Sequence, residues 1–117
     1  MSKKINIAIV GLGQIGIYLY NELNLKKKEI FTKTGKSISI VAVSAKNRNK
    51  KRKFKINKKI FYKNPLKIIE NKKVDILFEC IGKSDGISKK IVEKAIKNKI
   101  HVITPNKALI SKHGDYL

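Results

Sequence analysis

The stretch INIAIVGLGQIG, Ile5 to Gly16, decides the fold that the sequence predicts. Its first half is apolar and β-branched, the composition of a strand buried on both faces. Gly11, Gly13 and Gly16 follow as G-x-G-x-x-G, and apolar residues then recur four positions apart, which is the spacing of one helical face. A glycine triple alone is a weak signal. Its position between a strand and a helix gives it a physical meaning.

In such a turn the three glycines have different tasks. Gly11 permits the tight bend, Gly13 lets a diphosphate approach the backbone, and Gly16 lets the helix pack against the strand. The backbone N–H groups of Gln14 and Ile15 would lie at the helix N-terminus, where phosphates bind favourably. The motif therefore predicts a dinucleotide site made by these five residues. The alternative is a glycine turn that serves packing alone.

The rest of the chain alternates in the same way between apolar runs and helical patterns. We expect strands at residues 5–10, 38–44, 59–62, 74–82 and 101–104, and helices from the glycine motif to residues 26–28, from Pro65 onward and over 85–99, with a loop at 32–37. Strands with near-continuous apolar character predict a parallel sheet covered by helices on both faces. The predicted fold class is α/β, a Rossmann-type doubly wound sheet forming a single domain over residues 1–117.

The residues after the second expected strand bear on which dinucleotide is bound. A site that prefers NAD usually has an acidic residue there, which accepts hydrogen bonds from the ribose hydroxyls. This chain has Ser44, Ala45, Lys46, Asn47 and Arg48, with no acid. Lys46 and Arg48 would instead pair with a 2′-phosphate. We therefore expect Ala45, Lys46 and Arg48 to contact the cofactor, with NADP preferred over NAD.

The strong positive charge raises nucleic acid as a partner. Lys and Arg number 28 against 8 acidic residues, which gives a net charge of +20 and a pI near 10.2. In the densest stretch, residues 46–59, the basic residues are mostly lysine and Phe54 is the sole aromatic. Specific recognition favours arginine and stacked aromatics. We expect salt-sensitive, non-specific adsorption to polyanions and no specific nucleic-acid partner.

Hydropathy and cysteine content bear on membrane association and on the cellular compartment of the protein. The chain has no apolar run long enough to span a membrane, so no membrane association is expected. Cys80 is the single cysteine, which rules out an internal disulfide and fits a reducing cytoplasm. It lies within an apolar run, where a small buried side chain is a better interpretation than a nucleophile.

With these segments placed, the chain resembles the N-terminal part of homoserine dehydrogenase. The similarity lies in IAIVGLGQIG, GKSISIVAVSAKNRNKKR, DILFECIGKSDG and HVITPNKALISKHG, which occur in that family's order and spacing. It extends from Lys4 to Leu117. The ending is the most discriminating part, since other Rossmann proteins share the glycine turn alone. Lys83 and Pro105 depart from the residues usual in the family.

The resemblance implies NAD(P)-dependent interconversion of L-homoserine and L-aspartate 4-semialdehyde, a step toward threonine, methionine and isoleucine. It implies that Ile81 and Gly82 line the cofactor site and that Lys107 is both a catalytic and a cofactor-binding residue. It also implies that the chain is C-terminally incomplete, lacking a substrate-binding and dimerising domain, and that the full-length enzyme is a homo-oligomer. We expect these 117 residues alone to bind dinucleotide weakly and to show no turnover.

Other polar residues fit the site less well. We interpret Asn106 as a helix N-cap before a ligand contact. His101 and His113 have no metal-ligand partner at suitable spacing, so no metal site is expected. The acidic residues Asp75, Glu79 and Asp85 are too scattered in the sequence to suggest an acid–base pair.

Two other functions stay open on the sequence. One is a different NAD(P)-dependent dehydrogenase of the aspartate pathway, which should lack the TPNKALISKHG ending. The other is a nucleotide-binding module without catalysis, which would suit the short length.

Overall fold

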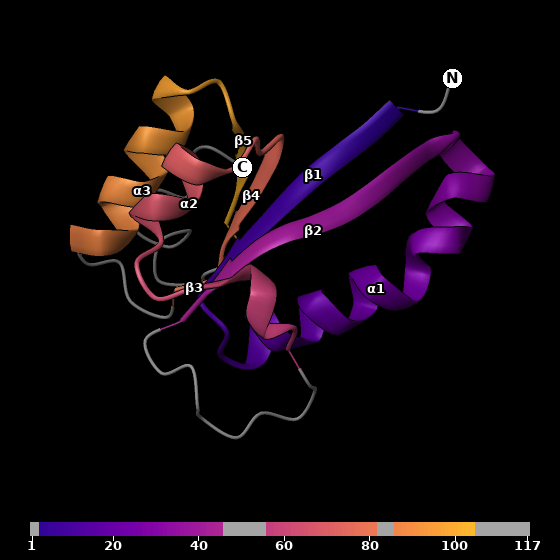
Figure 1. Ribbon diagram of the computed structural model, residues 1–117, viewed down its shortest axis with the longest axis horizontal. Coiled ribbons are helices and arrows are strands. Elements are labelled where there is room, and N and C mark those ends of the chain that lie inside the picture. The colour runs from indigo at the N-terminus through magenta and orange to yellow at the C-terminus, as the bar shows by residue number, and fades with distance from the viewer. Residues whose placement is uncertain (1–2, 46–55, 82–85, 105–117) are drawn as a thin grey trace.

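The computed structural model describes residues 3–45, 56–81 and 86–104, which form a five-stranded sheet with helices on both faces (Figure 1). In chain order the elements are β1 (Lys3–Val10), α1 (Gln14–Thr34), β2 (Lys36–Ser44), the 3-10 turn η1 (Lys58–Ile60), β3 (Phe61–Tyr62), α2 (Leu66–Asn71), β4 (Ile76–Glu79), α3 (Gly86–Lys97) and β5 (His101–Ile103). None of these helices is long and apolar enough to cross a membrane.

The sheet has the strand order β3-β2-β1-β4-β5, and all of its pairings are parallel. The strand β1 is central: the chain continues to β2 on one side and returns later to β4 on the other. The predicted α/β doubly wound parallel sheet is confirmed. Ligands of such sheets bind beyond the carboxyl ends of the strands, where the order changes direction. In this chain that place is the end of β1, which the glycine motif follows directly.

Alternation along β1 divides the core into two layers. Ala8 and Val10 pack in a cluster with residues of α2 and α3, including Ile68 and Ile91. The intervening Ile7 and Ile9 pack in a second cluster with Leu12 and Tyr20, beside α1. Figure 1 shows α1 on one side of the sheet and α2 with α3 on the other. Each isoleucine buried in these layers contributes roughly 1.5–3 kcal/mol, so the two layers hold β1 in the middle of the sheet.

The end of α1 differs from the prediction. The expected loop at residues 32–37 is wrong, because α1 continues to Thr34 and β2 begins at Lys36. Gly35 alone makes the turn. It adopts the left-handed conformation, with φ of 72°, and its N–H donates to the carbonyl oxygen of Phe31 at 2.8 Å. Glycine adopts this conformation without a steric penalty and commonly ends a helix.

The run of cations at residues 26–28 suggested an earlier end, because cations are favoured in the last turn of a helix. In the structure these lysines lie within α1. The ion pair Lys26–Glu22 joins the first of these lysines to the preceding turn, and the pair Lys33–Glu29 follows the run; both are spaced i,i+4. Pairs of this spacing stabilise a helix, which is a physical reason for α1 to extend beyond the lysines.

The boundaries of the other elements also shift by a few residues. The strand expected at 59–62 is β3 preceded by η1, and the strand expected at 74–82 contains the shorter β4. The helix expected to open at Pro65 begins one residue later, at Leu66. The side chain of Asn64 accepts a hydrogen bond from the Leu66 N–H at 3.0 Å, so Asn64 caps the helix from just before the proline.

Candidate dinucleotide-binding site

The bend after β1 has the geometry that requires glycine at its first position. Gly11 has φ of +93°, and its N–H donates to the carbonyl oxygen of Ser44 at 2.7 Å, which ties the bend to the end of β2. A Cβ atom at Gly11 would lie 2.7 Å from the carbonyl carbon of Cys80 and 2.8 Å from the nitrogen of Ile81. The bend therefore also rests against the end of β4.

Gly16 and Gly13 differ in what surrounds them. A Cβ at Gly16 would overlap the carbonyl oxygen of Gly11 and lie 2.9 Å from its carbonyl carbon, so the close approach of α1 to β1 needs glycine. Gly13 is exposed, and no described atom lies within 4 Å of the place its Cβ would occupy. Packing thus leaves no room for a side chain at Gly11 or Gly16, whereas the space beside Gly13 is open. That open space is where a phosphate would approach the backbone.

The N-terminus of α1 lies at this open position without a capping side chain. Gly13 is the N-cap residue, and its carbonyl oxygen accepts the first helical hydrogen bond, from the Ile17 N–H at 2.9 Å. The first turn of α1 contains no acidic residue, and both Gln14 and Ile15 are exposed. Uncapped N–H groups and the positive end of the helix dipole favour an anion here.

Ala45 and Ile81 lie on either side of the glycine turn. Ala45 follows Ser44, the last residue of β2, and Ile81 lies two residues beyond β4, beside Gly11. Both side chains are half-buried. Because the strands are parallel, their carboxyl ends share one edge of the sheet, so these residues of separate segments meet there. The structure therefore brings together the predicted residues Gly11, Gly13, Gln14, Ile15, Gly16, Ala45 and Ile81.

The remaining predicted site residues lie outside the described part of the chain. They are Lys46, Arg48, Gly82 and Lys107. Asn106, His113 and Asp85 lie outside it as well. Their predicted roles therefore stay predictions.

Glu79 is a feature of this edge that the sequence reasoning missed. It is the last residue of β4 and is fully buried, with 0% of its surface exposed. Its Oε1 accepts from the Ile81 N–H at 3.0 Å, and its Oε2 accepts from the Thr104 hydroxyl at 3.0 Å. Burial of a carboxylate is costly without such partners. The signal in the sequence was an acid inside an otherwise apolar strand, beside the glycine motif in a parallel sheet.

Cys80 is buried as predicted, with 9% of its surface exposed. Burial, together with the negative charge of Glu79, raises the pKa of its thiol to about 12. A thiol with so high a pKa stays protonated at neutral pH and is a poor nucleophile. Its role is to pack against Gly16 beneath the turn.

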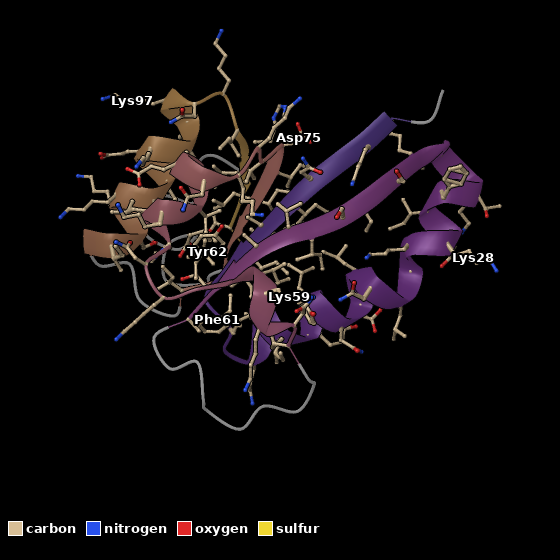
Figure 2. All side chains as sticks on the ribbon, in the orientation of Figure 1. Lys28, Lys59, Phe61, Tyr62, Asp75 and Lys97 are labelled. Atoms are coloured by element: carbon tan, nitrogen blue, oxygen red, sulfur yellow. The ribbon has the colours of Figure 1, made fainter. Side chains whose placement is uncertain are left out.

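Asp75 and His101 lie away from the described part of the site. Asp75, just before the amino end of β4, accepts a hydrogen bond at 2.7 Å from the N–H of Asn6, in the first half of β1. Figure 2 shows it well away from Phe61 and Tyr62, which mark the carboxyl edge in β3. His101 is exposed at the start of β5. Among the described residues no group of His, Cys, Asp or Glu could hold a metal ion.

A family model described as "Homoserine dehydrogenase, NAD binding domain" matches residues 11–117. The chain belongs to the homoserine dehydrogenase family. The match favours this family over that of a different dehydrogenase of the aspartate pathway. The homoserine dehydrogenase of Neisseria gonorrhoeae is 34% identical over 113 residues, which is 97% of this chain and 26% of that protein. The enzyme of Methylobacillus glycogenes is 33% identical over 93% of this chain and 26% of its own length.

Solved homoserine dehydrogenase structures have the same fold. A crystal structure of the S. aureus enzyme at pH 7.5 superposes with a TM-score of 0.86 at 30% identity, covering 97% of this chain and 29% of that one. The Thiobacillus denitrificans enzyme gives a TM-score of 0.79 at 27% identity, covering 98% of this chain and 26% of that one. The chain thus spans about a quarter of the length of the curated homoserine dehydrogenases that it matches.

Proposed function

We propose that this chain is the dinucleotide-binding part of a homoserine dehydrogenase. One observation carries the proposal: at the carboxyl edge of the sheet, the open position at Gly13 lies over the uncapped N-terminus of α1. The flanking Gly11 and Gly16 are closed by packing, so the bend is held while its middle is free. A cofactor diphosphate fits this arrangement, because it needs close backbone approach and several N–H donors. Membership of the family supports the same assignment.

The reaction proposed for the full-length protein is the interconversion of L-homoserine and L-aspartate 4-semialdehyde, in the biosynthesis of threonine and methionine. The nicotinamide cofactor, when bound, supplies or accepts the hydride. The residues of this chain would bind and orient it: the N–H groups of Gln14 and Ile15 at the diphosphate, and Ala45 at the ribose of the adenosine half. Lys107 would place an ammonium group beside the substrate. We further propose that the full-length protein is a cytoplasmic homo-oligomer.

The cofactor is proposed to be NADP(H) in preference to NAD(H). The support is chemical: β2 ends at Ser44, and Ala45 follows with no carboxylate to repel a 2′-phosphate. Lys46 and Arg48 come shortly after in the sequence. A carboxylate at this point would instead favour the free ribose hydroxyls of NAD(H).

A fluorescence titration with NADPH and NADH tests both statements. We expect saturable binding, tighter for NADPH. Gly13→Ala should weaken the affinity for NADPH about tenfold or more, because its methyl group would stand where phosphate oxygens meet the backbone donors. Thr32→Ala is the matched control, since Thr32 is exposed near the other end of α1. Tighter binding of NADH would refute the NADP preference, and binding that Gly13→Ala leaves unchanged would refute the site.

Turnover is expected to need more than these residues. The matched part of the curated relatives is about a quarter of their length, and hydride transfer needs a substrate that is held in place and shielded from water. We therefore expect these 117 residues alone to show no NADP-dependent oxidation of homoserine. Robust oxidation by the purified chain would contradict this statement without affecting the binding site.

A further inference from the structure

The fully buried Glu79 lies where three segments of the candidate site meet. Strand register pairs it with Val10, the residue before the glycine bend. Its carboxylate accepts from the Ile81 N–H at 3.0 Å, in the turn after β4. The other carboxylate oxygen accepts from the Thr104 hydroxyl at 3.0 Å, just beyond β5. A single side chain thus links the ends of the two strands on one side of the bend.

We propose that Glu79 is a positioning residue for the nicotinamide half of the dinucleotide. Its carboxylate holds Thr104 beside Ile81, and thereby fixes the point from which the chain continues toward Asn106 and Lys107. The inference rests on the proposed function. It adds that the diphosphate half of the site is set by the glycine bend, whereas the nicotinamide half depends on the bond between Glu79 and Thr104.

The chemistry of the contact supports this role. A carboxylate is an acceptor only, so an N–H and an O–H donor, brought by two separate segments, suit its two oxygens. Hydrogen bonds to an ionised group are stronger than those between neutral groups, and more so where water is excluded. An apolar residue would fill the same place without this bond. Among the described residues, the backbone pairing of β4 with β5 already ends at Phe78 and Ile103, so Thr104 lies beyond it.

Thr104 is constrained by its backbone as well as by its bond to Glu79. Its side chain is half-buried, and the next residue is Pro105. A residue before proline is restricted to extended backbone conformations. Both the backbone and the hydroxyl of Thr104 are therefore constrained, and the bond to Glu79 fixes Thr104 just beyond the end of β5.

The test replaces the donor and keeps the carboxylate. Thr104→Val removes the hydroxyl at almost constant shape, and Thr104→Ser retains it as the rescue variant. Calorimetry measures the affinity of each protein for NADPH and for 2′-phospho-ADP-ribose, which has the same adenosine and diphosphate groups but no nicotinamide. Circular dichroism verifies that each variant is folded.

We expect Thr104→Val to weaken NADPH binding roughly three- to tenfold, the range for one lost hydrogen bond. Its affinity for 2′-phospho-ADP-ribose should change less than about twofold, and Thr104→Ser should bind both ligands as the unaltered chain does. A purely structural role would lower both affinities together. Equal losses, or no loss of NADPH affinity, would therefore overturn the inference.

Two further outcomes are distinguishable. If the unaltered chain binds neither ligand, the proposed function fails and the inference fails with it. If Thr104→Val does not fold, Glu79→Gln takes its place, because its amide keeps the shape and a neutral hydrogen bond to each partner. It should weaken NADPH binding selectively by a smaller factor, and an equal effect on both ligands would overturn the inference in that variant too.

Discussion

Gly16→Ala tests whether the glycine motif is held by packing. The added methyl group would overlap the carbonyl oxygen of Gly11 and lie 3.5 Å from Cβ of Cys80. The obstructing atom belongs to the backbone, so it cannot move by rotamer change, and α1 would have to shift away from β1. Such overpacking costs about 3 kcal/mol, against which alanine gains about 1 kcal/mol of helix propensity over glycine. The net loss is about 2 kcal/mol.

Thermal unfolding followed by circular dichroism measures this loss. For a domain of this size, about 2 kcal/mol corresponds to a fall in Tm of roughly 8 °C or more. Gly13→Ala is the matched control, because no described atom lies within 4 Å of the added methyl group, and its Tm should fall much less. If Gly16→Ala is as stable as Gly13→Ala, the close approach of helix and strand does not require glycine, and packing does not explain the third glycine of the motif.

Three further results are expected. Burial raises the pKa of the Cys80 thiol from 9.0 to about 12, so this thiol should resist iodoacetamide at pH 9 until urea unfolds the chain. For the same reason, the contribution of Cys80 to the free energy of unfolding should decline between about pH 9 and 12. Rapid labelling of the folded chain would contradict the burial of the thiol. Gly35→Ala should lower the free energy of unfolding by about 1 kcal/mol, and Gly35→Asn by less, in urea titrations; equal stability of all three proteins would contradict the left-handed turn. Replacing both Lys46 and Arg48 with alanine should weaken NADPH binding and leave NADH binding little changed, by fluorescence titration; equal losses would show that neither side chain meets the 2′-phosphate.

The fold was predictable because its strongest determinants are local. A β-branched run, a glycine triple and a helical pattern together specify a β-α unit, and apolar strands without polar alternation specify a sheet covered on both faces. The first β-α unit places β2 beside β1, and the strand order β3-β2-β1-β4-β5 results when the chain later crosses to the other side of β1. The bend at Gly11 and the close packing at Gly16 have the geometry that the motif predicts.

The features missed depend on contacts between distant parts of the sequence or on competing local signals. The lysines at residues 26–28 indicate a helix end as well as an exposed helical surface, and only the left-handed turn at Gly35 decides between them. Glu79 looked like one more scattered acid, because its partner Thr104 lies beyond another strand. A buried hydrogen bond across a sheet has no signature in either segment alone.

The packing of Gly11 and Gly16 against Cys80 has a consequence for the order in which the protein matures. During synthesis the glycine bend emerges from the ribosome well before β4, the strand that supports it. The separation between β1 and β4 is large: Asn6 and its hydrogen-bond partner Asp75 are 69 positions apart in the sequence. Distant pairings of this kind form slowly, since a long loop must close first. In a nascent chain, the glycine bend would therefore reach its binding conformation only after β4 has paired with β1.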